Sequence, residues 1–218
     1  MQDDNPYAPP RADSIARADV SSPGIDGYTP LGWRTTAAAF AVCLDVGFNV
    51  ILRVIGPSRD DGILELFLTL GSAVLVLMWI YQAAKNLPAL GRYGMEHSPG
   101  WCVGVFFIPI ASLWYPFQGM REIWKASDPA YPQGSWPTAP VTPTLGLWWG
   151  TYLASSVTGV IAAVARSGPA AATLGIGLVS EGIRGVAAGA LIVLMRGVAS
   201  RQASIAAGEP SSPQASPP

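Results

Sequence analysis

Long apolar stretches separated by short polar ones fill the chain between about residues 36 and 200. A helix that crosses about 30 Å of hydrocarbon needs about 20 mostly apolar residues. Four stretches meet that length, whereas a fifth, residues 101–117, is shorter and contains Pro109 and Pro116. We therefore predict an all-α, polytopic transmembrane bundle with four spanning helices. The predicted spans cover about residues 36–55, 62–84, 145–165 and 170–195.

The residues between these stretches predict two helical hairpins. Ser98-Pro99 and Thr142-Pro143 each place a hydroxyl group before a proline, a pattern that is typical of the start of a helix. Residues 56–61 and 166–169 are long enough only for tight antiparallel connections. The hairpins are therefore expected to be joined by a long middle section, residues 86–142.

The distribution of Lys and Arg bears on the third apolar stretch. If it spans the bilayer, six basic residues fall on each side of the membrane. If residues 99–124 form a Pro-broken, re-entrant or interfacial segment instead, nine fall on one side and three on the other. The positive-inside rule favours the second arrangement, with both termini and the middle section in the cytoplasm. Five spans remain the alternative.

Composition supports a lipid environment. Only 12% of the 218 residues are charged and 50% are hydrophobic, whereas soluble domains carry about 25% charged residues. The net charge of −1 gives no basic field for nucleic acid, so no nucleic-acid partner is expected. Residues 1–33 and 201–218 are rich in Pro, Ser and Asp and are predicted to be disordered tails around a transmembrane domain of residues 34–200.

No set of residues predicts a metal site, a cofactor or an enzyme. The two cysteines, Cys43 and Cys102, lie in apolar runs and are expected to be buried free thiols. His97 is the only histidine, too few for a structural zinc site, and we expect it at the surface of a loop. The chain also lacks a nucleophile–base set and a phosphate-binding loop.

Three ionisable residues fall inside the predicted spans. Asp45 lies near the middle of the first, and Glu181 and Arg184 lie in the last. Such groups are costly in hydrocarbon and should face protein or water. Glu181 and Arg184 are three residues apart and can pair, and Asp45 is a second possible partner of Arg184. This polar core either fixes the packing of the helices, the interpretation we favour, or handles an ion or polar ligand.

Small residues recur at four-residue spacing on the last two spans. Gly146 and Gly150 form one such pair, and Gly185 and Gly189 another. This spacing allows close helix approach. Packing within the chain is the preferred interpretation, and a homo-oligomer is the alternative.

The middle section and its flanks contain three distinctive motifs: AAKNLPALG (83–91), SPGWCVGVFFIPIASLWYPFQGMREIWKASDP (98–129) and, further along, the pair Trp148-Trp149. In this combination the chain resembles the bacterial membrane family called domain of unknown function 4328. The chain departs from the family pattern at Ser112, often Asn, and at Tyr115, often basic. The resemblance implies a bacterial inner-membrane protein and no particular activity. The residues that we single out as a binding or packing site are Asn86, Ser98, Pro99, Gly100, Trp101, Pro109, Ser112, Trp114, Pro116, Gln118, Arg121, Glu122 and Trp124.

These patterns predict a non-enzymatic membrane protein that acts as a scaffold, a sensor or a partner-binding protein. Its partner would be a cytoplasmic protein bound by the middle section or the tails. The alternative is a small transporter or channel component that uses the Asp45, Glu181 and Arg184 core.

Overall fold

A computed structural model describes residues 27–55, 61–164 and 170–208, and all regular secondary structure in this part of the chain is helical, with no strand. The described residues form six α-helices and three short 3-10 helices, joined by turns and loops. Most of both predicted tails and nearly all of the two predicted tight turns lie outside them.

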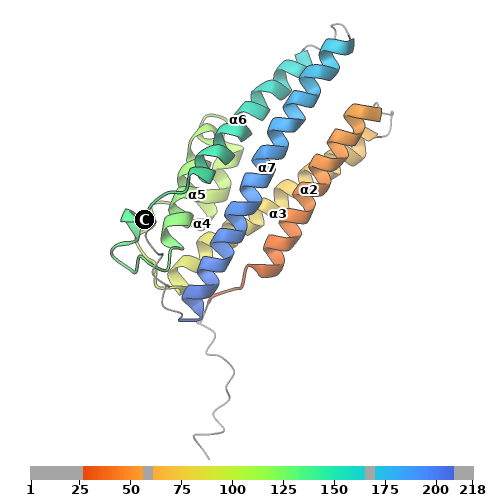
Figure 1. Ribbon diagram of the computed structural model, residues 1–218. Coiled ribbons are helices and arrows are strands. Elements are labelled where there is room, and N and C mark those ends of the chain that lie inside the picture. Colours follow the sequence, from red (N-terminus) through yellow and green to blue (C-terminus); the bar gives the residue numbers. More distant parts are fainter. Residues whose placement is uncertain (1–26, 56–60, 165–169, 209–218) are drawn as a thin grey trace, which may run out of the picture.

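Four long helices form two hairpins (Figure 1). Helix α2 (Gly32–Ile55) packs against α3 (Asp61–Ala89), and α6 (Pro143–Val164) packs against α7 (Ala170–Ala206). Helix α7 also packs against α2, which joins the two hairpins. The helices extend beyond the expected domain limits of residues 34 and 200. Long-range contacts explain these longer boundaries, because Leu31 and Gln202 are both buried.

The third apolar stretch is broken, as its prolines predict. It consists of α4 (Pro99–Gly104), two 3-10 helices (Val105–Phe107 and Ala111–Leu113) and α5 (Tyr115–Ala126). Helices α4 and α5 lie against each other, since a Cβ atom on Gly119 would be 3.3 Å from the Cys102 sulfur. The Glu122 side chain accepts hydrogen bonds from the backbone N–H groups of Glu96 and His97. The segment therefore doubles back, and residues 99–126 do not form one continuous helix.

The apolar core lies at the end of the bundle where α2 begins and α3 and α7 end; we call this the closed end. Its largest fully buried side chains include Trp79, Leu87, Met120, Ile123 and Leu194. The last 3-10 helix (Trp136–Thr138) covers part of it. Towards the other end the long helices carry outward-facing apolar side chains, among them Ile55, Phe67, Val160 and Val164.

Three helices of the described residues are long and apolar enough to cross a membrane. They are Gly32–Ile55, Gly62–Ala89 and Leu174–Ala206. The predicted count of four spans is thus not confirmed. The predicted span that is not among these three is α6, which has 22 residues. Its middle carries four hydroxyl-bearing residues that lower its hydropathy: Thr151, Ser155, Ser156 and Thr158. Each of these hydroxyl groups donates a hydrogen bond to a backbone carbonyl of its own helix.

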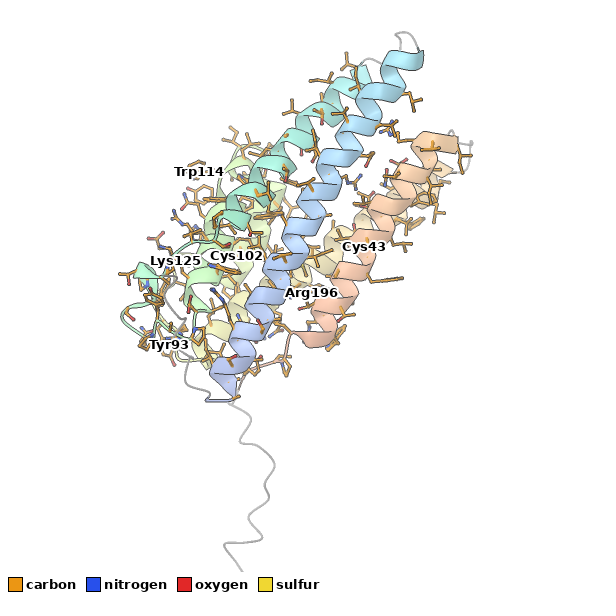
Figure 2. The ribbon with its side chains drawn as sticks, viewed as in Figure 1. Cys43, Tyr93, Cys102, Trp114, Lys125 and Arg196 are labelled. Atoms are coloured by element: carbon orange, nitrogen blue, oxygen red, sulfur yellow. The ribbon has the colours of Figure 1, made fainter. Side chains whose placement is uncertain are left out.

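The expectation that both cysteines are buried is wrong for Cys43. Cys102 is buried between α4 and α5, whereas Cys43 is exposed on α2 (Figure 2). When a helix packs against its neighbours on one face, the residues of its other face point outward. An apolar run along such a helix therefore does not by itself predict that every residue in it is buried.

Candidate functional site

A cavity of about 440 Å³ lies between the two hairpins. Residues from α2, α3, α6 and α7 line it, and they include Asp45, Glu181 and Arg184, the three ionisable residues predicted to form a polar core. We call this space the central cavity. Its size falls in the range of about 300–1,000 Å³ that small-molecule sites occupy.

Asp45 is held by three donors. The Arg184 guanidinium binds one of its carboxylate oxygens. The other oxygen accepts hydrogen bonds from Thr69 Oγ1 at 2.8 Å and from Asn49 Nδ2 at 3.2 Å. This carboxylate is buried, with 3% of its residue surface exposed, and its hydrogen-bonding needs are met within the protein. The predicted pairing of Asp45 with Arg184 is therefore present.

Glu181 is held much more loosely. Its Oε1 lies 3.7 Å from Arg53 Nη2, and its Oε2 lies 3.8 Å from Arg184 Nη1. Both distances exceed a normal charge-assisted hydrogen bond of about 2.7–2.9 Å. Oε2 is buried and accepts no hydrogen bond from the described residues. Glu181 is thus a buried carboxylate with acceptor capacity to spare.

Sequence reasoning missed several polar residues of the central cavity. In the sequence Arg53 and Glu65 lie near the ends of apolar runs, where charged residues are common, whereas in the structure both line the cavity. The missed signal is the four-residue spacing of polar positions inside apolar helices, which places them on one face. On α2 these positions are 45, 49 and 53, and on α3 they are 65 and 69.

The wall formed by α6 is aromatic and hydroxyl-bearing. Trp148, Tyr152, Ser155 and Ser156 all line the cavity. On the same helix, Thr158 Oγ1 lies 3.2 Å from Ser180 Oγ, and this contact between hydroxyl groups ties α6 to α7. The cavity therefore combines fixed charges on one side with an aromatic, weakly polar wall on the other.

The second predicted group, drawn from the middle section, does not form one site. Asn86 is fully buried at the closed end, where its amide donates to Thr29 O and Gln202 Oε1 and accepts from Gln82 Nε2 and Thr29 N. All its hydrogen-bonding positions are used inside the protein. Ser98 caps α4 by accepting from Trp101 N at 3.2 Å, with Pro99 and Gly100 in the first turn.

The tip between α4 and α5 is strongly exposed and apolar. Pro109 lies between the two 3-10 helices there, and Ser112 donates to its carbonyl oxygen at 2.8 Å. The side chains of Ile110 and Trp114 are 85% and 61% exposed, and Figure 2 shows Trp114 pointing away from α7. Pro116, by contrast, is buried in the first turn of α5.

Glu122 organises a smaller cavity of about 230 Å³ beside α5. Its carboxylate lies 3.0 Å from His97 Nδ1, and both side chains are nearly buried. The expectation of a surface histidine is therefore wrong, because Glu122 holds the ring and its preceding backbone in place. Gln118 accepts a hydrogen bond from Arg121 at 3.0 Å at the rim of this cavity.

Trp124 contacts α7 instead. Its ring lies 3.9 Å from the Arg201 guanidinium, in a cation–π arrangement. The same ring lies against Gly197, where an added Cβ atom would approach it to 2.9 Å.

The family model described as "Domain of unknown function (DUF4328)" matches residues 61–201. The chain belongs to the DUF4328 family. No curated protein and no solved structure matches it. The DUF4328 match includes Glu65, Glu181 and Arg184, whereas Asp45 and Arg53 lie on α2, before the matched region.

Proposed function

We propose that this DUF4328 protein is a four-span, multi-pass membrane protein that binds a small polar solute in the central cavity, as a small transporter or channel component. The observation that carries the proposal is the incompletely paired Glu181 beside a cavity of about 440 Å³. A charged group at the bilayer centre costs about 2.5–3.5 kcal/mol on insertion scales. A purely structural ion pair would be expected to close around its charges, and this one borders open space.

Orientation in the membrane follows from the basic residues. Seven lie in or beside the closed end and the middle section: Arg34, Lys85, Arg92, Arg121, Lys125, Arg196 and Arg201. Among the described residues only Arg53 lies near the opposite end of the bundle. This asymmetry supports a closed end in the cytoplasm, an inner-membrane location in a bacterial cell, and cytoplasmic termini. The doubled-back α4–α5 segment supports four spans over five.

Thiol accessibility of the cavity tests the proposal. Ser156 is exposed and lines the cavity, and its neighbour Val157 is 60% exposed on the outside of the same helix. We expect Ser156→Cys, in a Cys43→Ser background, to react with a water-soluble methanethiosulfonate reagent in intact liposomes. Val157→Cys, facing lipid, should stay unlabelled under the same conditions. If Ser156→Cys is as inert as Val157→Cys, water does not reach the cavity and the solute-binding function is wrong.

The scaffold, sensor or partner-binding function remains a prediction, as do a cytoplasmic protein partner and a homo-oligomer. An added Cβ atom at Gly146, Gly150 or Gly189 would meet no other atom within 4 Å, whereas one at Gly185 would touch Val46 of α2. The first three positions are therefore open to a second copy, and Gly185 serves packing within the chain.

A further inference from the structure

We infer that the central cavity takes a small organic cation that carries an ammonium group, and not an anion or a metal ion. This inference rests on the proposed function, since it names the solute class for the same cavity. Three features of the cavity carry it: the balance of its charges, the unequal hydrogen bonding of its two central carboxylates, and the aromatic wall that faces them.

The charge balance favours a cation. The lining holds three carboxylates, Asp45, Glu65 and Glu181, and two guanidinium groups, Arg53 and Arg184. The formal sum is one negative charge. Within the span of a bilayer an uncompensated charge is costly, and a monovalent cation compensates it. An anion would add a second negative charge.

The hydrogen bonds of the two central carboxylates indicate which of them binds the ammonium group. Arg184, Thr69 and Asn49 all donate to Asp45, so this carboxylate has little left to offer a ligand. Glu181 lies beyond hydrogen-bond distance of both its arginine neighbours, and its buried Oε2 accepts nothing from the described residues. An ammonium group supplies up to three donors at one point. Glu181 is therefore the carboxylate that receives it.

The aromatic wall selects an organic cation over a metal ion. Trp148 and Tyr152 line the cavity from α6, with the Tyr152 ring stacked on Trp149, and aromatic rings of this kind attract ammonium groups. In the part of the chain that the structure describes, no group of three or more His, Cys, Asp or Glu side chains is placed to hold a metal ion. The two arginines beside Glu181 would also repel a compact divalent ion.

Charge selectivity of cysteine modification tests the inference without knowledge of the natural solute. The probes are the trimethylammonium and the sulfonate ethyl methanethiosulfonates, applied to Ser156→Cys in the Cys43→Ser background. Rates are normalised to Tyr93→Cys, because Tyr93 is 59% exposed outside the cavity. We expect a normalised preference of at least tenfold for the cationic reagent. Glu181→Gln should reduce that preference to near one, and Glu96→Gln, outside the central cavity, should leave it unchanged.

Protection by small ligands gives the second readout. Benzylammonium should slow labelling of Ser156→Cys, whereas benzyl alcohol and benzoate at the same concentration should not. Glu181→Gln should raise the half-protecting concentration of benzylammonium at least tenfold, and Glu181→Asp should restore part of the protection. Gel filtration of each variant checks that it is folded.

The outcomes separate the two proposals. Labelling by both reagents without cationic preference, or protection by benzoate, would overturn the ammonium inference and leave the solute-binding function standing. A cationic preference that is unchanged in folded Glu181→Gln would likewise overturn the ammonium inference alone. If neither the cationic nor the anionic reagent labels Ser156→Cys, the proposed function itself is overturned.

Discussion

Gln202 joins three parts of the chain through one fully buried amide. Its Nε2 donates to the Ala83 carbonyl oxygen at 3.0 Å and to Ser127 Oγ at 3.1 Å, and its Oε1 accepts from Asn86 Nδ2 at 3.0 Å. The amide therefore ties α7 to α3 and to the end of α5. A buried polar group that loses its partner costs about 1–3 kcal/mol, so this position bears heavily on stability.

Gln202→Leu should destabilise the protein by about 2 kcal/mol or more, because it leaves the Asn86 amide and the Ser127 hydroxyl without this partner. The measurement is thermal unfolding in detergent, followed by gel filtration of the soluble fraction. Ser200→Ala is the matched control, since Ser200 is exposed two residues earlier and its hydroxyl bonds only to its own helix. Equal stability of the two variants would show that the Gln202 network contributes little.

The rate at which the Cys102 thiol is alkylated should rise with pH over a higher pH range in the folded protein than in the unfolded chain, because Cys102 is buried. Burial, and next the nearby Glu122 carboxylate, raise the pKa of the Cys102 thiol from 9.0 to about 11. In a Cys43→Ser protein we expect alkylation of Cys102 by iodoacetamide to keep accelerating from pH 8 to pH 10, about tenfold per unit, because only the thiolate reacts. The unfolded chain should level off above pH 9.

The same shift predicts a loss of stability at high pH. Between pH 9 and pH 11 the folded protein keeps the Cys102 proton while the unfolded chain has lost it, so rising pH favours unfolding. The loss attributable to this thiol should be about 2–3 kcal/mol over that window. Cys102→Ala should remove this part of the decline. A decline of the same size in Cys102→Ala would assign it to other groups.

At the residue scale, sequence reasoning finds charges that stand out and misses those at helix ends. Asp45, Glu181 and Arg184 are conspicuous because each interrupts an apolar run. Arg53 lies at the end of its run, where a basic residue is ordinarily a solvated loop charge. Only the three-dimensional placement of α7 beside α2 brings it within 3.7 Å of Glu181.

The contact between α5 and α7 depends on the absence of a side chain at Gly197. The Trp124 ring occupies the space next to this glycine. The Arg201 guanidinium also contacts the ring, and Arg201 Nη1 lies 3.3 Å from the Asp128 carboxylate. A Cβ atom would lie 2.9 Å from the ring, closer than packed carbon atoms approach.

Gly197→Ala should therefore destabilise the protein by about 1–3 kcal/mol, the usual cost of overpacking. Gly189→Ala on the same helix is the control, because its Cβ atom would meet no other atom within 4 Å and alanine is the better helix former. Thermal unfolding in detergent compares the two variants. A Gly197→Ala protein as stable as Gly189→Ala would mean that the Trp124 ring moves away at no cost.

At the scale of elements, local signals predict where helices begin better than where they end. Ser98-Pro99 starts α4 and Thr142-Pro143 starts α6, where Thr142 Oγ1 accepts from Thr144 N at 3.3 Å. The prolines also predict the break between α4 and α5. The continuation of α7 to Ala206 was missed, because partners more than 100 residues away, Ala83 and Asn86, stabilise its last turns around Gln202.

The described part of the molecule consists of two hairpins that lie side by side (Figure 1). They share an apolar core at the closed end, and the central cavity lies between them further along. The closed end holds the apolar core, the Gln202 network and the broken α4–α5 segment. The apolar core and the Gln202 network, which stabilise the fold, thus lie at the closed end, and the proposed solute site lies further along the bundle. Variants at Gln202 or Gly197 should accordingly lower stability, and Glu181 variants should change binding while the closed end stays intact.

The number of spans can be decided by reporter fusions at residue 60, at residue 133 and at the C-terminus. The doubled-back α4–α5 segment keeps Glu96, His97 and Glu122 together at one end, so four spans place residue 133 and the C-terminus on the same side. The excess of Lys and Arg at that end predicts that it is the cytoplasmic side. We expect alkaline phosphatase fused at residue 60 to be active and fusions at residue 133 and the C-terminus to be inactive, with the reverse pattern for green fluorescent protein. If residue 133 reports with residue 60 instead, the α4–α5 segment crosses the bilayer, and five spans replace four.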